Sequence, residues 1–211
     1  MVNETVHRVL DATANPGALG LAAFGVTTVL LNLVNAKLIP FDAMIIAMGI
    51  FYGGLAQIIA GSMEWKKGNT FAMVAFTSYG VFWLSFVAIM MLPKLGLAAA
   101  ASEMSMVAFL LVWGIFTFIM FLGTLRICKA LSFVFGTAVI LFLMLAAHDY
   151  TGNADVGMAA GYWGILVGFA AMYTGLAQVV NEAYHKVLMP IWPYKSREIT
   201  PVVIRDEKAP A

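Results

Sequence analysis

The sequence predicts an all-α integral membrane protein with six transmembrane helices. Of its 211 residues, 62% are hydrophobic and only 11% are charged, whereas soluble domains carry about 25% charged residues. The mean hydropathy is +0.90. A chain of this length cannot hide so much apolar surface in one aqueous core, because small domains leave much of their surface exposed. We therefore expect lipid to surround much of the chain.

Six runs are long and apolar enough to cross a bilayer, which takes about 20 helical residues. They cover residues 18–36, 41–63, 70–92, 104–125, 130–148 and 156–183. None of the seven prolines interrupts a run, where proline would remove a backbone hydrogen bond. Asn15 and Pro16 fit the cap and the first position of the first helix. We expect a transmembrane domain over residues 1–189 and a disordered cytoplasmic tail over 190–211, which is charged and rich in proline.

Lys and Arg are distributed unevenly between the two sides of this predicted bundle. The N-terminus, the second and fourth loops and the tail hold ten of the twelve, whereas the first and third loops hold only Lys37 and Lys94. Cytoplasmic loops of membrane proteins carry such an excess of positive charge. We therefore expect both termini in the cytoplasm.

Several function classes find no support in the sequence. The net charge of +1 says nothing about a nucleic-acid partner, but no cluster of Lys and Arg suggests one, so we expect none. Cys128 is the single cysteine, which excludes an internal disulfide and a cysteine-based metal site. The three histidines lie far apart, and the chain shows no catalytic motif. We expect no metal, no cofactor and no enzymatic activity.

Polar side chains inside the predicted spans are the candidate functional residues, since such residues are costly in lipid and mark pathways or helix contacts. In the first span Phe24, Thr28 and Asn32 share one stripe at a spacing of four residues, with Thr27 beside them. The other candidates are Gln57 and Glu64 in the second span and Ser78 and Tyr79 in the third. Each of these polar groups either joins helices together or lines a path.

Depth in the membrane brings four of these positions into one layer. Counting from the cytoplasmic ends of the spans, Phe24, Gln57, Tyr79 and Ala138 lie six to nine residues deep. Two aromatic rings and one amide at equal depth predict an apolar constriction on a polar path, and such constrictions gate by excluding water.

The last span carries small residues at alternating spacings of four and three. They are Gly157, Gly161, Gly164, Gly168, Ala171 and Gly175. Small residues let helix backbones approach closely in lipid. The seam therefore predicts tight packing, either between subunits or between helices of one subunit. Residues 52–57 and 173–178 also share the pattern Tyr-x-Gly-Leu-Ala-Gln, which leaves an internal duplication open.

Residues 15–32, NPGALGLAAFGVTTVLLN, closely resemble the first conserved block of the acetate uptake transporters, the succinate–acetate permease (SatP/YaaH) family. Residues 52–83 resemble its second block, and the likeness continues more loosely to about Ile191. The resemblance implies a homo-hexamer of six-helix subunits in a prokaryotic plasma (inner) membrane. Each subunit would carry its own path for acetate, other small monocarboxylates or succinate. The family's constriction matches Phe24 and Tyr79, but Ala138 replaces its usual bulky aliphatic residue, which predicts a wider gate.

The expected mechanism follows from the cost of placing a bare carboxylate in a medium of low dielectric. Side chains that hydrogen-bond the carboxylate would replace part of its hydration; the candidates are Thr27, Thr28, Asn32, Gln57 and Ser78. Glu64 and Glu182 are the candidate proton carriers, so an anion channel and a proton symporter are both open. The competing hypothesis is a structural or accessory membrane protein that conducts nothing.

Overall fold

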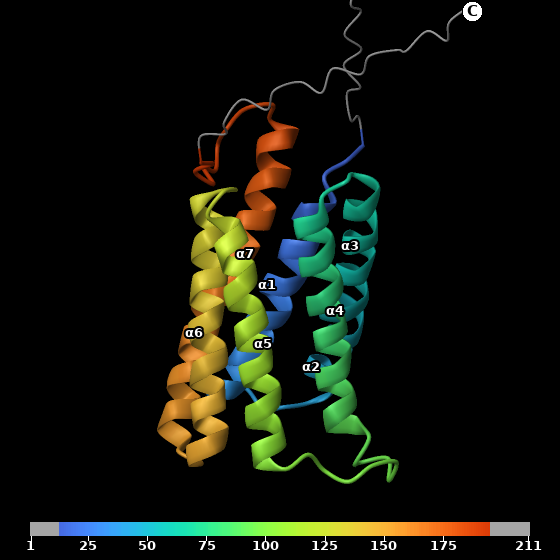
Figure 1. Ribbon diagram of the computed structural model, residues 1–211, viewed down its shortest axis with the longest axis vertical. Coiled ribbons are helices and arrows are strands. Elements are labelled where there is room, and N and C mark those ends of the chain that lie inside the picture. The colour runs from blue at the N-terminus through green and yellow to red at the C-terminus, as the bar shows by residue number, and fades with distance from the viewer. Residues whose placement is uncertain (1–12, 195–211) are drawn as a thin grey trace, which may run out of the picture.

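The structure, a computed structural model, describes residues 13–194 as an all-helical bundle (Figure 1). Its elements are α1 (Pro16–Asn35), α2 (Ala43–Met48), the π-helix η1 (Gly49–Ala56), α3 (Gln57–Lys66), α4 (Thr70–Met91), α5 (Glu103–Thr124), α6 (Lys129–Thr151) and α7 (Ala154–Ala183). Because α2, η1 and α3 are continuous, this part of the chain has six helices long and apolar enough to cross a membrane. Each overlaps one predicted run, so the predicted fold class is confirmed.

The start of α1 is built as the sequence predicts. The Asn15 side chain accepts a hydrogen bond of 3.0 Å from the backbone N–H of Gly17, and Pro16 occupies the first turn. An Asn or Asp side chain caps α2, α4 and α7 in the same way. These side chains bond backbone N–H groups that have no partner within the helix.

The second span differs from a uniform α-helix, because residues 49–56 form a π-helix. Here the backbone of Gly53 lies against both α1 and α4. A methyl group on Gly53 would lie 2.8 Å from Cγ2 of Thr27 and 2.9 Å from the Trp83 indole. Glycine is thus required by the close approach. Hydropathy predicts the span but not the wider turn of the π-helix, since an α-helix and a π-helix bury similar stripes of apolar residues. Short π-helical segments frequently occur at functional sites.

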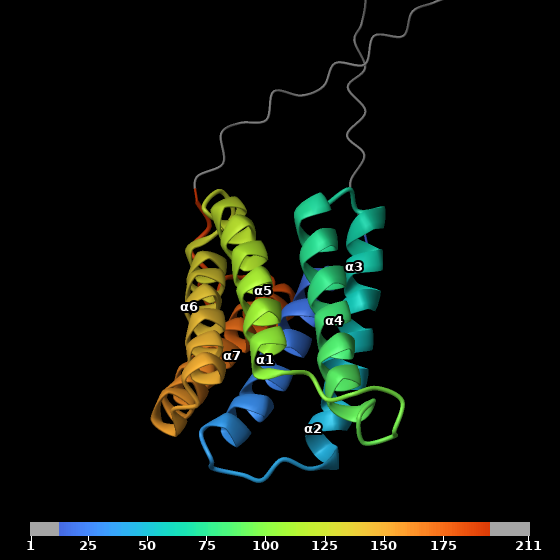
Figure 2. The ribbon, with the colours of Figure 1, turned by 60° about the horizontal axis from the view of Figure 1, so that its bottom comes forward.

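Helix α1 occupies the middle of the bundle, with α7 on one side and η1 and α3 on the other. The ribbons of α4 and α5 stand apart in both views (Figures 1 and 2). Aromatic side chains fill this space, with ring centroids 5.0 to 6.4 Å apart. They include Tyr79, Phe82, Phe86, Phe109, Trp113 and Phe116. The bundle therefore combines close backbone packing around α1 with bulky ring packing between α4 and α5.

The small residues of α7 pack against α1 of the same chain. A methyl group on Gly168 would lie 2.7 Å from the backbone nitrogen of Val29, and one on Gly161 would collide with the backbone of Ala36. Likewise, a methyl group on Gly25 of α1 would lie 2.5 Å from the backbone nitrogen of Met172 on α7. Of the two arrangements that the sequence left open, the structure thus shows contact within one subunit.

Residues 190–194 pack against the bundle, whereas the sequence predicts a disordered tail from Pro190 onward. They pack against the turn between α5 and α6. The carbonyl oxygens of Trp192 and Ile191 accept hydrogen bonds from the backbone of Lys129 and Ala130, and Tyr194 donates to Ile127. These hydrogen bonds could not be predicted from the composition of the segment, because they join backbone groups only. The remaining predicted tail, 195–211, lies outside the described residues.

We predict that Gly168→Val separates α1 from α7 and destabilises the protein. The added Cβ meets backbone atoms of α1 that cannot move aside, its two methyl groups need still more room, and such overpacking costs about 1–3 kcal/mol. Thermal unfolding of the detergent-solubilised protein should show the lower midpoint. Ala159→Val, at an exposed position on the same helix, is the matched control. Equal midpoints for the two variants would contradict the contact.

Candidate functional site

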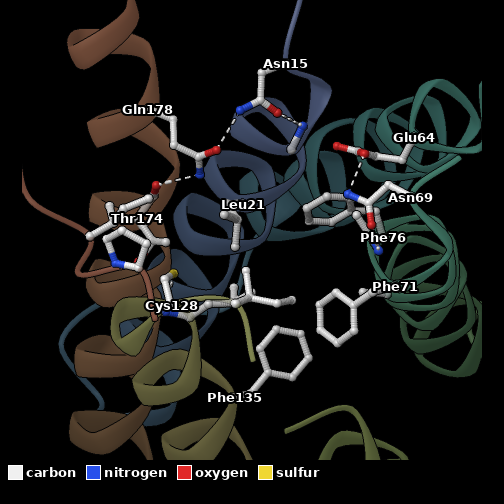
Figure 3. A pocket seen from close by; sticks show the side chains of 17 residues that line it. Asn15, Leu21, Glu64, Asn69, Phe71, Phe76, Cys128, Phe135, Thr174 and Gln178 are labelled. Carbon is white, nitrogen blue, oxygen red and sulfur yellow. Dashed lines mark hydrogen bonds between the residues drawn. The ribbon is translucent and has the colours of Figure 1, made fainter. Parts of the chain in front are cut away.

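Two adjoining cavities lie between α1, α3, α4 and α6. The larger, here called the vestibule, has a volume of about 240 Å³ and lies at the end of the bundle where α1 begins (Figure 3). The smaller, here called the neck, has a volume of about 20 Å³. Both are lined by Leu21, Ala75, Phe76 and Phe135. The neck and the vestibule therefore adjoin at these four side chains.

Polar groups gather around the vestibule (Figure 3). Asn15 Nδ2 donates a hydrogen bond of 2.6 Å to Gln178 Oε1, which joins the start of α1 to α7. Opposite them, Asn69 Nδ2 donates a 2.8 Å hydrogen bond to Glu64 Oε2. Glu64 is only 3% exposed. Its carboxylate therefore stands at the cavity as a buried ionisable group with a neutral partner.

The rest of the vestibule wall is largely apolar. Ile191 and Pro193 contribute from the C-terminal segment, so residues 190–194 form part of the cavity. Cys128 also lines it, immediately before α6. Burial raises the pKa of the Cys128 thiol above its usual value, although the backbone N–H groups of Leu131 and Ala130 oppose this shift. The sequence offered no signal for these apolar lining residues.

The neck contains all four residues that the depth argument placed in one layer: Phe24, Gln57, Tyr79 and Ala138. The ring centroids of Phe24 and Tyr79 lie 5.5 Å apart. A cavity needs about 10–15 Å³ to hold one water molecule, so 20 Å³ admits about one water and no acetate. The structure thus shows the neck closed, and a solute larger than water enters only if side chains move.

Tyr79 is held by a residue that the sequence did not single out. Its hydroxyl donates a hydrogen bond of 2.9 Å to Thr117 Oγ1 on α5. Thr117 in turn donates to the carbonyl oxygen of Trp113, at 2.7 Å. A lone threonine in an apolar span resembles many others that bond only their own helix, so the sequence carried no signal for this role.

Gln57 is completely buried at the neck, and only one end of its amide is paired. Nε2 donates a hydrogen bond of 2.6 Å to the carbonyl oxygen of Gly53. Oε1 has no hydrogen-bond partner among the described residues, and the same is true of Thr27 Oγ1 and Trp83 Nε1 nearby. A buried polar atom without a partner costs about 1–3 kcal/mol. A water molecule or a polar solute in the neck would remove that cost for Gln57.

Four of the predicted path residues line neither cavity: Thr27, Thr28, Asn32 and Ser78. Asn32 is buried in the α1–α7 interface against Gly164, and its Nδ2 donates to the carbonyl oxygen of Thr28. Ser78 is half-buried on α4. Asn32 therefore packs at the contact between α1 and α7, while its hydrogen bonds stay within α1.

The sequence of this chain is similar to those of known transporters. The chain is 49% identical over 178 residues to the succinate-acetate/proton symporter SatP of Escherichia coli K12, which covers 84% of this chain and 95% of the relative. It is 37% identical over 196 residues to acetate permease A of Emericella nidulans, covering 84% of this chain and 65% of that protein.

A solved structure of the bacterial acetate channel SatP matches the fold with a TM-score of 0.83 and 49% sequence identity. The match covers 85% of this chain and 99% of the solved one. The profile of the GPR1/FUN34/yaaH family matches residues 3–194. By sequence and by fold, the chain therefore belongs to the GPR1/FUN34/yaaH family.

Proposed function

We propose that this protein transports acetate and other small monocarboxylates, with succinate as a larger substrate, through a path inside each subunit. The path runs from the vestibule through the neck. The observation that carries the proposal is that the two cavities adjoin, so that a polar rim lies next to an aromatic constriction. The naming of the relatives as acetate transporters supports the same substrate class.

Each group along this path has a distinct role in the proposal. Asn15, Asn69 and Gln178 replace part of the hydration of an entering carboxylate, as hydrogen-bond donors can in a medium of low dielectric. Gln57 offers the next polar contact at the neck, where the rings of Phe24 and Tyr79 exclude water. No Lys or Arg lines either cavity in the described part of the chain, so no fixed positive charge retains the anion.

Glu64 is the proposed proton carrier, because it is the only ionisable carboxylate lining either cavity within residues 13–194. Glu182, the other candidate from the sequence, is exposed on α7. In a symporter, Glu64 would carry the proton that accompanies the substrate carboxylate. In a channel Glu64 would only lower the local anion concentration.

Flux of labelled acetate into proteoliposomes tests the function directly. We expect uptake that saturates and that protein-free liposomes lack. A current that persists without a pH gradient would exclude obligatory symport, whereas uptake that needs the gradient would support proton coupling through Glu64. Absence of any acetate flux would refute transport and favour the structural or accessory role.

We further propose that the vestibule opens to the cytoplasm of a multi-pass plasma-membrane protein assembled as a homo-hexamer. Both ends of the described chain lie at the vestibule end, where Tyr194 bonds Ile127 and Asn15 bonds Gln178. Five basic residues of the described chain lie at this end, namely Lys66, Lys67, Arg126, Lys129 and Lys186, against Lys37 and Lys94 at the other. Exposed apolar side chains on α5, such as Val112 and Ile119, offer surface to lipid or to neighbouring subunits.

Labelling of Cys128 tests this orientation, since it is the only cysteine in the chain. A membrane-impermeant methanethiosulfonate should modify Cys128 in inverted vesicles and not in intact cells. Because burial raises the thiol pKa, labelling should be slow and should accelerate about tenfold from pH 7 to pH 8, as the reactive thiolate forms. Equal labelling in intact cells would contradict the orientation.

Ala138→Leu should narrow the neck and the substrate range. The three added carbons enter a space of about 20 Å³, and a steric difference of about one methyl group changes discrimination roughly tenfold. We expect the ratio of lactate to acetate uptake in proteoliposomes to fall by about that factor. Ala147→Leu, at an exposed position of the same helix, is the control. An unchanged ratio of lactate to acetate uptake would mean that Ala138 does not form part of the constriction.

A further inference from the structure

We propose that Thr117 is a positioning residue that keeps the neck closed by holding the hydroxyl of Tyr79. The hydrogen bond from Tyr79 Oη to Thr117 Oγ1, here called the latch, joins α4 to α5. The inference rests on the proposed function, because it assigns a role in gating to a residue outside the path. Thr117 lines neither the vestibule nor the neck.

The direction of the latch follows from the two hydrogen bonds of Thr117. Its hydroxyl proton is committed to the carbonyl oxygen of Trp113, at 2.7 Å. Its oxygen therefore acts as the acceptor toward Tyr79, and the phenolic proton of Tyr79 points to α5. While the latch is closed, that proton is not available to a carboxylate in the neck. The closed neck thus presents the ring of Tyr79 and withholds its hydrogen-bond donor.

The surroundings make the latch costly to break. Thr117 is 0% exposed and Tyr79 is 5% exposed. The Tyr79 ring lies between those of Phe24, Trp113, Phe116 and Phe135, at centroid distances of 5.5 to 6.1 Å. These rings offer no alternative acceptor of comparable strength, and an unpaired hydroxyl in apolar surroundings is unfavourable. Tyr79 therefore stays in its closed position until another acceptor reaches its hydroxyl.

A substrate carboxylate is such an acceptor, and a stronger one than a neutral threonine hydroxyl. Hydrogen bonds to ionised acceptors are roughly twice as strong as those between neutral groups. A carboxylate that reaches the neck can therefore exchange the Thr117 bond of Tyr79 for one to itself. In this scheme the ring moves as the substrate binds, and the latch reforms after it has passed. The latch thereby favours opening by carboxylates over opening by neutral solutes.

Replacement of Thr117 tests the latch in proteoliposomes. Thr117→Val keeps the shape of the side chain and removes the acceptor, so acetate flux should rise roughly five-fold, which corresponds to about 1 kcal/mol, the net value of one hydrogen bond. Thr117→Ser keeps the hydroxyl and should retain wild-type flux. Thr124→Val is the matched control, because Thr124 is also buried on α5 but bonds only its own helix, at Phe121. Thr117→Ala serves in place of the valine variant if that protein does not assemble.

A double-mutant comparison separates the latch from a general packing effect. Tyr79→Phe already lacks the hydroxyl, so adding Thr117→Val to it should leave flux unchanged, whereas a packing effect would act in both backgrounds. A five-fold rise in both backgrounds, or equal flux for wild type and Thr117→Val, would overturn the latch while the transport function stands. Absence of flux in the wild type would overturn the proposed function itself.

Discussion

Close packing of α1 on α7 is the constraint on which the rest of the structure depends. Gly25, Gly161 and Gly168 bring the two backbones into direct contact, and small residues of this kind drive helix association where lipid provides no hydrophobic force. The contact places α1 in the middle of the bundle. Only from that position can Leu21 and Phe24 face cavities that are lined from the other side by α3, α4 and α6.

Polar and apolar groups are arranged along the path in an order that suits the passage of a small anion. The vestibule offers amides from Asn15, Asn69 and Gln178, whereas the neck offers one buried amide, Gln57, among aromatic rings. On the proposed path hydration would be replaced in stages, and the more apolar cavity is also the smaller one. Such a profile favours passage over tight binding, because a site must release the ion as readily as it accepts it.

The two kinds of packing in the bundle differ in the side-chain movement that they allow. Around α1, backbone contact leaves no room for movement, since protein interiors pack as densely as organic crystals. Between α4 and α5, large rings separate the backbones, and the hydrogen bond from Tyr79 to Thr117 is a polar side-chain link across that space. An aromatic side chain, which has only the two torsion angles χ1 and χ2, can change rotamer without displacing its helix. The moving part of the neck is therefore expected on the α4–α5 side.

Hydropathy by itself determined the six spans, and a local motif determined the cap at Asn15. Depth along the single helices determined the layer that holds Phe24, Gln57, Tyr79 and Ala138. All of these features depend on composition or on position within one helix. Only the tertiary structure decided which helices meet. Tyr79 and Thr117 are 38 residues apart and Asn15 and Gln178 are 163 apart, and Asn32 turned out to bond within its own helix beside Gly164. The rotation of each helix about its axis sets such partners, and it follows from the packing of all six spans together.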